Sequence, residues 1–361
     1  MRERGESYDK IKAIRKNLCV YFTAFFTALT GCAGSDNLSV SQQTEAVMAT
    51  EESGRAEESG PAEETMQAQE TAQEEETMQE EGAAQTEGNG QTAETPADEA
   101  TEEPADPVIE EADWSAYFNE INGSAVVYDP DLNRYLVYNQ ELAETRRSPC
   151  STFKIISSLI ALENGIITQD HSMRTWSGET FWNEAWNRDI NFLDAFQTSC
   201  VWYFREVVDE IGKDTMEQEL ERLKYGNCDI SDWEGRLNTN NNNPALTGFW
   251  IESSLLISPM EQVQVMERIF GENTDYSEET LEQLKQAMLL PGQKDTNALI
   301  YGKTGMGKDQ GVTVDAWFTG FADISEKRIF FCVYLGRTDH QNVSSTVAKE
   351  TAIKIISDYY T

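Results

Sequence analysis

The chain carries a serine and a lysine at a spacing that suits nucleophilic catalysis, in the tetrapeptide Ser151-Thr152-Phe153-Lys154. Apolar residues follow at helical spacing until Gly165, so we expect the motif to open a helix. Residues three apart share a helix face, so the Lys154 amine can reach the Ser151 hydroxyl. A serine in the first turn also meets free backbone N–H groups, which favour an oxyanion beside it. The pattern predicts a serine nucleophile with a lysine as its base.

The scarcity of histidine also favours a lysine base. The chain has two histidines, His171 and His340, and neither stands at a metal-ligand spacing. We therefore expect both to be surface or packing residues, and we expect no metal site.

Ser-x-x-Lys alone arises often by chance, so it does not identify a catalytic site by itself. Two further motifs make the pattern more specific. Ser199-Cys200-Val201 follows it, and Lys303-Thr304-Gly305 comes later within strand-like sequence. In this order the three motifs resemble the signature of penicillin-recognising enzymes. Tyr225-Gly226-Asn227 and the segment 249–255, Phe-Trp-Ile-Glu-Ser-Ser-Leu, narrow the resemblance to class D β-lactamases, in particular their Gram-positive branch. The resemblance runs from about residue 115 to the end of the chain.

The resemblance implies roles for the polar residues of the motifs. Ser151 would attack the β-lactam carbonyl, and Lys154 would react with carbon dioxide or bicarbonate to form a carbamate, the general base for acylation and deacylation. Ser199 would relay a proton to the departing nitrogen. Only a neutral lysine reacts with carbon dioxide, so its pocket must be dry enough to lower its pKa. No other cofactor is expected.

The resemblance also implies a binding pocket around these groups. Trp250 would donate its indole N–H to the carbamate. The backbone N–H groups of Ser151 and Met306 would form the oxyanion hole. The other expected pocket residues are the apolar cover, Val201 and Ile251, and the groups near the substrate carboxylate, Lys303, Thr304 and Gly305.

One feature of many class D enzymes is missing from the sequence. These enzymes carry an arginine after the last strand that binds the substrate carboxylate, whereas residues 342–347 here read Asn-Val-Ser-Ser-Thr-Val. Arg337 lies nearby, but the sequence assigns it no such role. The range of β-lactams and the efficiency of turnover therefore stay open.

Three functions share these motifs: a hydrolytic β-lactamase, a β-lactam-sensing domain that stays acylated, and a D,D-transpeptidase or carboxypeptidase. A sensor of the usual kind would bring several membrane helices and a zinc-protease motif such as H-E-x-x-H, and this sequence has neither. Trp250 and its apolar neighbours suit a carbamate rather than the lysine of a transpeptidase. We therefore expect a β-lactamase and keep the other two as alternatives.

The N-terminal third of the chain differs in composition from the rest. Residues 1–31 have a basic start and a short apolar run, and Leu29-Thr30-Gly31-Cys32 resembles the lipobox of bacterial lipoproteins. This resemblance implies lipidation of Cys32 and a position on the outer face of the cell membrane. Residues 32–112 are Glu-, Gln- and Thr-rich and carry more than half of the net charge of −36, so we expect a disordered tether. The acidic balance argues against nucleic acid as a partner.

Residues 113–361 are long enough for one domain of the α+β class. Strand-like runs at 124–128 and 135–138 suggest a hairpin, and 314–321 and 329–335 suggest a second strand pair. Residues 346–360 and a segment that begins at Ser258-Pro259 are expected to be helical. We expect a β-lactamase/transpeptidase-like fold: an antiparallel sheet from both chain ends, with a mostly helical insertion. The sequence does not pair Cys150, Cys200, Cys228 and Cys332, and it does not set the oligomeric state.

Overall fold

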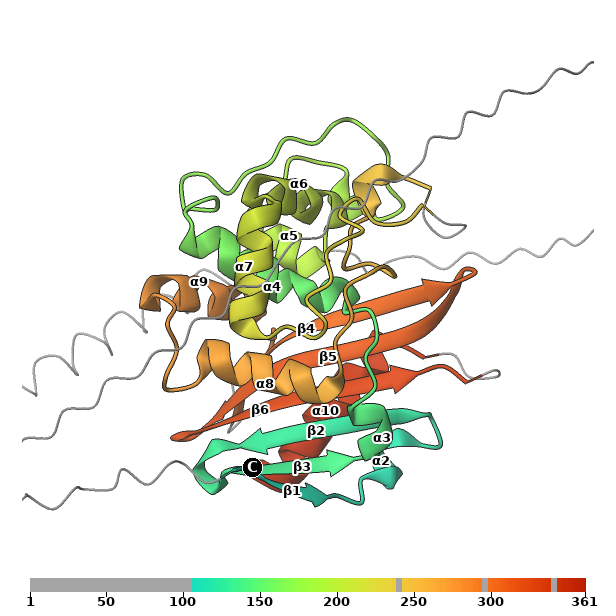
Figure 1. Ribbon diagram of the computed structural model, residues 1–361, viewed down its shortest axis with the longest axis vertical. Coiled ribbons are helices and arrows are strands. Elements are labelled where there is room, and N and C mark those ends of the chain that lie inside the picture. The colour runs from blue at the N-terminus through green and yellow to red at the C-terminus, as the bar shows by residue number, and fades with distance from the viewer. Residues whose placement is uncertain (1–105, 238–241, 294–297, 339–342) are drawn as a thin grey trace, which may run out of the picture. The chain divides into compact units, whose positions relative to one another are not determined.

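The computed structural model describes residues 106–237, 242–293, 298–338 and 343–361 (Figure 1). The expected signal segment, the lipidation site Cys32 and residues 32–105 of the expected tether lie outside these ranges, as do His340 and Asn342. Within the described residues, no helix is both long and apolar enough to cross a membrane.

A six-stranded sheet joins the two ends of the domain, in the order β1-β3-β2-β6-β5-β4. The strands are β1 (Val108–Glu111), β2 (Gly123–Asp129), β3 (Arg134–Tyr138), β4 (Ala298–Asp309), β5 (Val312–Ile324) and β6 (Lys327–Gly336). Strand β2 pairs antiparallel with both β3 and β6, so the first and last parts of the domain meet at the centre of the sheet. The expected hairpin and the expected later strand pair are both confirmed.

The first strand corrects two expectations. Val108–Glu111 lies within the segment 32–112 that we expected to be disordered, yet it forms β1. Strand β1 also pairs in parallel with β3, so the sheet is mixed rather than wholly antiparallel. The two apolar residues Val108 and Ile109 interrupt the acidic composition, which continues at Glu110 and Glu111, and they give the chain a short β-favouring run at the sheet edge.

Two short helices lie among the first strands of the domain, and the longer helices lie in its middle and at its C-terminal end. They are α2 (Ser115–Phe118), α3 (Gln140–Ala143), α4 (Lys154–Glu163), α5 (Phe192–Thr198), α6 (Val201–Ile211), α7 (Lys213–Leu223), α8 (Pro259–Phe270), α9 (Glu278–Met288) and α10 (Ser345–Tyr360). Short 3-10 turns are η1 (Pro130–Leu132), η2 (Cys150–Phe153), η3 (Glu184–Trp186) and η4 (Pro244–Leu246). Helix α8 begins as expected, with Ser258 as N-cap, Pro259 in the first turn and Glu261 completing a capping box.

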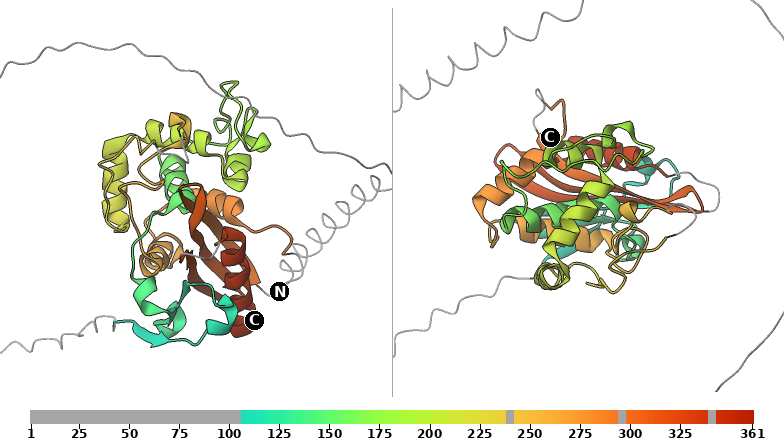
Figure 2. Two further views of the ribbon diagram at one scale, coloured as in Figure 1. Left: turned by 90° about the vertical axis from the view of Figure 1, so that its right-hand side faces the viewer. Right: turned by 90° about the horizontal axis from the view of Figure 1, so that it is seen from above.

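The sheet has a buried core on each face because its strands alternate two sets of apolar residues. On one face, Ala125, Val127 and Phe331 pack with α2 and α10. On the other, Val126 and Phe330 join the core of the helical insertion, which α8 links to the sheet. Figure 2 shows α10 and the insertion on opposite sides of the sheet. The N-terminal end of α4 therefore lies between the sheet and the insertion, where η2 contacts β4.

Candidate active site

Ser151 and Lys154 meet as their spacing predicts. Ser151 lies in the 3-10 turn η2, and Lys154 is the first residue of α4. The Lys154 Nζ donates a hydrogen bond of 3.0 Å to the Ser151 Oγ. Ser151 is half-buried at the cavity wall, so its hydroxyl can meet both a ligand and its base.

Lys154 is buried in a way that favours its neutral form. Its side chain is 1% exposed, and no carboxylate is paired with it among the described ion pairs. Its Nζ lies 5.4 Å from the centre of the Phe204 ring. Burial lowers the pKa of the amine to about 8. A substantial fraction of Lys154 is therefore neutral near physiological pH, which is the form that acts as a base or a nucleophile.

A second serine and lysine pair forms between motifs that are far apart in sequence. The Lys303 Nζ on β4 donates hydrogen bonds to the Ser199 Oγ at 3.1 Å and to the Thr304 carbonyl at 3.3 Å. Burial, and then the positive charge of Lys154, lower the pKa of Lys303 well below its usual value. The coupling of the two amines means that the Ser151 and Ser199 motifs share one electrostatic site.

Glycines allow strand β4 to pack closely against the nucleophile turn. A Cβ on Gly305 would lie 2.9 Å from the Pro149 carbonyl oxygen and 2.9 Å from the Thr152 Cγ2. A Cβ on Gly307 would lie 3.1 Å from the Cys150 Sγ. The glycine of the Lys-Thr-Gly motif is therefore a packing requirement, because a side chain there would push β4 away from Ser151.

The motifs open into one cavity of about 680 Å³. Residues that the sequence predicted line its inner part, namely Ser151, Ser199, Val201, Ile251, Thr304, Gly305 and Met306. The sequence did not predict the outer wall, which contains Glu179, Trp182, Trp186, Arg236, Asn243 and Lys308. Two loops meet in that wall, where the Asn243 Nδ2 donates to the Glu179 Oε1 at 2.7 Å. Trp182 in this wall is 75% exposed, which only the structure reveals.

Trp250 does not line the cavity but lies buried behind it. Its ring stacks on Phe153 with centroids 5.8 Å apart, and it meets Phe249 edge-on at 5.1 Å. Its indole Nε1 is buried and has no hydrogen-bond partner within the described residues. A buried N–H without a partner is costly and uncommon. Within the described residues, this N–H is therefore a hydrogen-bond donor that remains available behind the cavity.

The backbone is strained at three positions on this site. Cys150, Ser199 and Glu252 have φ angles of 49°, 59° and 52°, in the left-handed region that L-residues rarely adopt. All three line the cavity. Such strain persists where surrounding contacts hold it, and it clusters at functional sites.

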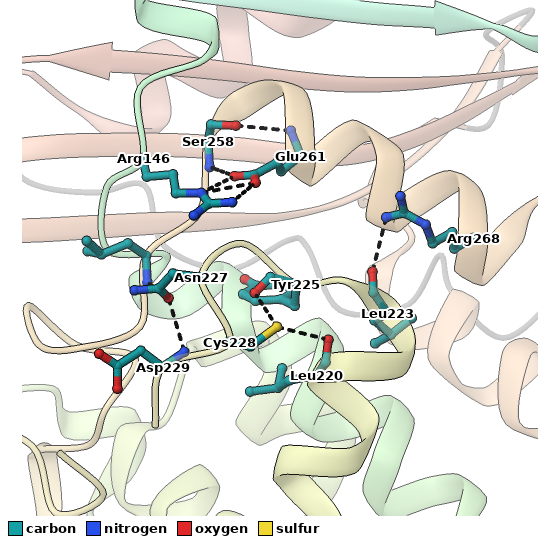
Figure 3. Close-up of polar contacts among 11 residues, drawn as sticks. Arg146, Leu220, Leu223, Tyr225, Asn227, Cys228, Asp229, Ser258, Glu261 and Arg268 are labelled. Atoms are coloured by element: carbon teal, nitrogen blue, oxygen red, sulfur yellow. Dashed lines mark hydrogen bonds and ion pairs between the residues drawn. The ribbon is translucent and has the colours of Figure 1, made fainter. Parts of the chain in front are cut away.

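Tyr225-Gly226-Asn227 shapes the site by holding the segment that follows Trp250. The Asn227 side chain donates to the Ser254 carbonyl at 2.9 Å and accepts from the Leu256 N–H at 2.9 Å. Figure 3 shows Asn227 beside Asp229, and the Asn227 Oδ1 also accepts a hydrogen bond from the Asp229 N–H. The same figure shows Arg146 bonded to Glu261 at the start of α8. These contacts hold the backbone of residues 254–256.

Gly226 is the residue of this motif that tolerates substitution least. Its φ is +57°, and a Cβ would lie 2.0 Å from the Leu256 carbonyl oxygen. We expect Gly226→Ala to lower the free energy of unfolding by more than about 2 kcal/mol. Gly165 is a matched control, because its φ is +67° but nothing lies within 4 Å of a Cβ. Gly165→Ala should cost only about 1 kcal/mol, and equal losses in thermal or urea denaturation would contradict the close approach at Leu256.

Arg337, which the sequence left without a role, does not line the cavity. Its Nε is buried without a hydrogen-bond partner in the described part of the chain. Trp317 is fully buried and donates from its Nε1 to the Ser148 carbonyl at 3.1 Å. The cysteines Cys150, Cys200, Cys228 and Cys332 are all unpaired.

Comparison with known proteins shows the family of the domain. Residues 123–357 match the family model described as the penicillin-binding protein transpeptidase domain. Among curated proteins, the chain is 32% identical over 247 residues to β-lactamase OXA-1 of Escherichia coli, which covers 67% of this chain and 87% of OXA-1. Among solved structures, a class D β-lactamase from Bacillus subtilis aligns with a TM-score of 0.58 and 28% identity, covering 68% of this chain and 94% of that one.

A regulatory protein is also similar. The chain is 30% identical over 250 residues to BlaR1 of Bacillus licheniformis, a match that covers 69% of this chain and 39% of BlaR1. The chain thus spans about two fifths of the length of that relative. Both an enzyme and a regulator therefore share the domain, and the family alone does not decide between them.

Proposed function

Because the chain belongs to the penicillin-binding protein transpeptidase domain family, we propose that it hydrolyses β-lactam antibiotics through a covalent acyl-enzyme on Ser151. The observation that carries the proposal is the buried Lys154 amine, 3.0 Å from the Ser151 hydroxyl and with its pKa lowered to about 8. The similarity to class D β-lactamases supports the same chemistry.

The residues around Lys154 fit a carboxylated lysine. The amine is buried and partly neutral, the Phe204 ring lies beside it, and the unpartnered Trp250 N–H offers a donor. Carbon dioxide or bicarbonate would convert the amine into an anionic general base. Val201 and Ile251 line the cavity. We expect their apolar side chains to limit the access of water to this base.

The acylation step uses the two serine and lysine pairs in turn. The Ser151 Oγ bonds to the lactam carbonyl carbon while its proton passes to the base at Lys154. The bond from that carbon to the lactam nitrogen then breaks, and the proton held by the base at Lys154 passes through Ser199, which hydrogen-bonds to Lys303, to the nitrogen, so the base is free again. In this mechanism the backbone N–H groups of Ser151 and Met306 donate to the carbonyl oxygen of the substrate. Two such donors stabilise the transition state by several kcal/mol.

Deacylation separates a hydrolase from a sensor. A water activated by the base at Lys154 attacks the Ser151 ester, releases the ring-opened product and restores the hydroxyl. A sensor would lack this step and stay acylated, and the similarity to BlaR1 makes that reading the second candidate. Binding of the β-lactam carboxylate falls to Lys303 and Thr304 in both readings.

Hydrolysis of nitrocefin under multiple-turnover conditions tests the proposal. We expect colour to develop well beyond one equivalent of enzyme, in the presence of bicarbonate. A burst of one equivalent without further turnover would support the sensor or the transpeptidase and contradict the hydrolase.

The N-terminal segment completes the proposal outside the described residues. We propose that Cys32 is lipidated, that residues 1–31 are removed as a signal peptide, and that the acidic tether holds the domain at the outer face of the cell membrane. Metabolic labelling with a palmitate analogue should mark the wild-type chain and not Cys32→Ala. Labelling of both would contradict this proposal.

A further inference from the structure

Ser148 lies three residues before the nucleophile and holds the loop that carries Trp250. Its side chain is 7% exposed. The Ser148 Oγ donates to the Trp250 carbonyl at 3.0 Å and accepts from the Glu252 N–H at 2.8 Å. The Ser148 carbonyl accepts from the Trp317 Nε1 on β5 at 3.1 Å. One serine thus joins the nucleophile segment, the Trp250 loop and the sheet.

The neighbours of Ser148 pair with the same loop. Arg147 and Ile257 exchange two backbone hydrogen bonds of 2.9 Å, and the Cys150 N–H donates to the Trp250 carbonyl at 2.9 Å. Segment 147–150 therefore fixes both ends of the loop 250–257. The loop needs such support because Glu252 holds a left-handed φ of 52°.

The position of the Trp250 indole depends on these contacts. Trp250 packs its ring on Phe153, two residues after Ser151, while its backbone is bonded to Ser148 and Cys150. Its Nε1 has no partner in the described residues, so no hydrogen bond of its own fixes the direction of that N–H. The direction is set instead by packing and by the backbone bonds.

We propose that Ser148 is a positioning residue, which fixes the Trp250 N–H relative to the Ser151 and Lys154 pair and thereby holds carbon dioxide on Lys154. This inference rests on the proposed carboxylation of Lys154. Without the Ser148 hydroxyl, the Trp250 carbonyl keeps the Cys150 N–H, but the side-chain link of Ser148 to the Trp250 carbonyl and the Glu252 N–H is lost. The loop then relaxes, and the donor to the anionic base is placed less well.

Ser148→Ala tests the inference by its bicarbonate dependence. We expect the variant to remain folded and to need about tenfold more bicarbonate for half-maximal nitrocefin hydrolysis, the scale of one or two net hydrogen bonds. In ¹³C-bicarbonate, its lysine carbamate resonance should be weaker than that of the wild type at equal, limiting bicarbonate. The resonance is measured without substrate, so it reports carboxylation rather than activity.

Ser124→Ala is the matched control. Ser124 is fully buried on β2, and its Oγ donates to the Tyr138 carbonyl at 2.9 Å, outside the cavity lining. Ser124→Ala should lower the free energy of unfolding about as much as Ser148→Ala does. It should leave the bicarbonate concentration for half-maximal nitrocefin hydrolysis unchanged. If bicarbonate stimulates the wild type and Ser148→Ala at the same concentrations, the role of Ser148 is wrong, while the carboxylation of Lys154 stands. A wild type with no carbamate resonance would overturn both the inference and the proposed base.

Discussion

Replacing Ser151 with alanine abolishes covalent labelling by a fluorescent penicillin and lowers nitrocefin hydrolysis by at least about 10³-fold, as removal of a nucleophile does in other serine hydrolases. The physical reason is that Ser151 supplies the oxygen that bonds to the substrate, and Lys154 lies within hydrogen-bonding distance of that oxygen. Gel fluorescence after incubation with the penicillin measures the label directly.

Ser157→Ala is the matched control for this result. Ser157 is buried one turn further along α4, and its Oγ donates only to backbone carbonyl oxygens of Phe153 and Lys154 in the described structure. The control should retain labelling. Persistent labelling of Ser151→Ala at the wild-type rate would remove Ser151 from its role.

Replacing Lys154 with alanine should slow acylation and leave the acyl-enzyme almost without turnover. We expect the rate of nitrocefin hydrolysis to fall by about 10²- to 10⁴-fold, the usual range for loss of a general base. Added bicarbonate should stimulate the wild type and not the variant. A chase of the fluorescent penicillin measures the loss of label over time. A normal rate in Lys154→Ala, together with indifference of the wild type to bicarbonate, would contradict a base on Lys154.

Lys154→Arg separates carboxylation from positive charge. A guanidinium stays protonated and does not capture carbon dioxide, so this variant should fail in deacylation as Lys154→Ala does.

In the wild type, the Lys154 pKa of about 8 sets the pH dependence of carboxylation. Below that pH the neutral fraction of the amine falls about tenfold for each pH unit, so the bicarbonate needed for half-maximal activity should rise as the pH falls.

Local chemistry made part of this fold predictable. Turn-forming residues at 129–133 separate two β-favouring runs, and the expected hairpin formed. Ser258, Pro259 and Glu261 together mark a helix start, and α8 begins there. The contact of Ser151 with Lys154 follows from helical periodicity alone. In each case the signal and the structure lie within a few residues of each other.

Long-range packing was not predictable from such signals. The contact between Lys303 and Ser199 joins residues 104 apart, and only the resemblance to a family placed them together. Ser148 gave no signal, because serine is common and its role depends on a loop 102 residues away. The short strand at Val108–Glu111 was hidden by the acidic residues around it, since strand formation there depends on pairing with β3.

Intact-mass spectrometry during penicillin consumption, with peptide mapping, tests whether the protein hydrolyses penicillin through Ser151. With limiting penicillin and bicarbonate present, we expect a transient gain of one penicillin mass, located on the Ser151 peptide, followed by return to the mass of free enzyme. A permanent adduct, an adduct on another residue or the absence of any adduct would contradict hydrolysis through Ser151.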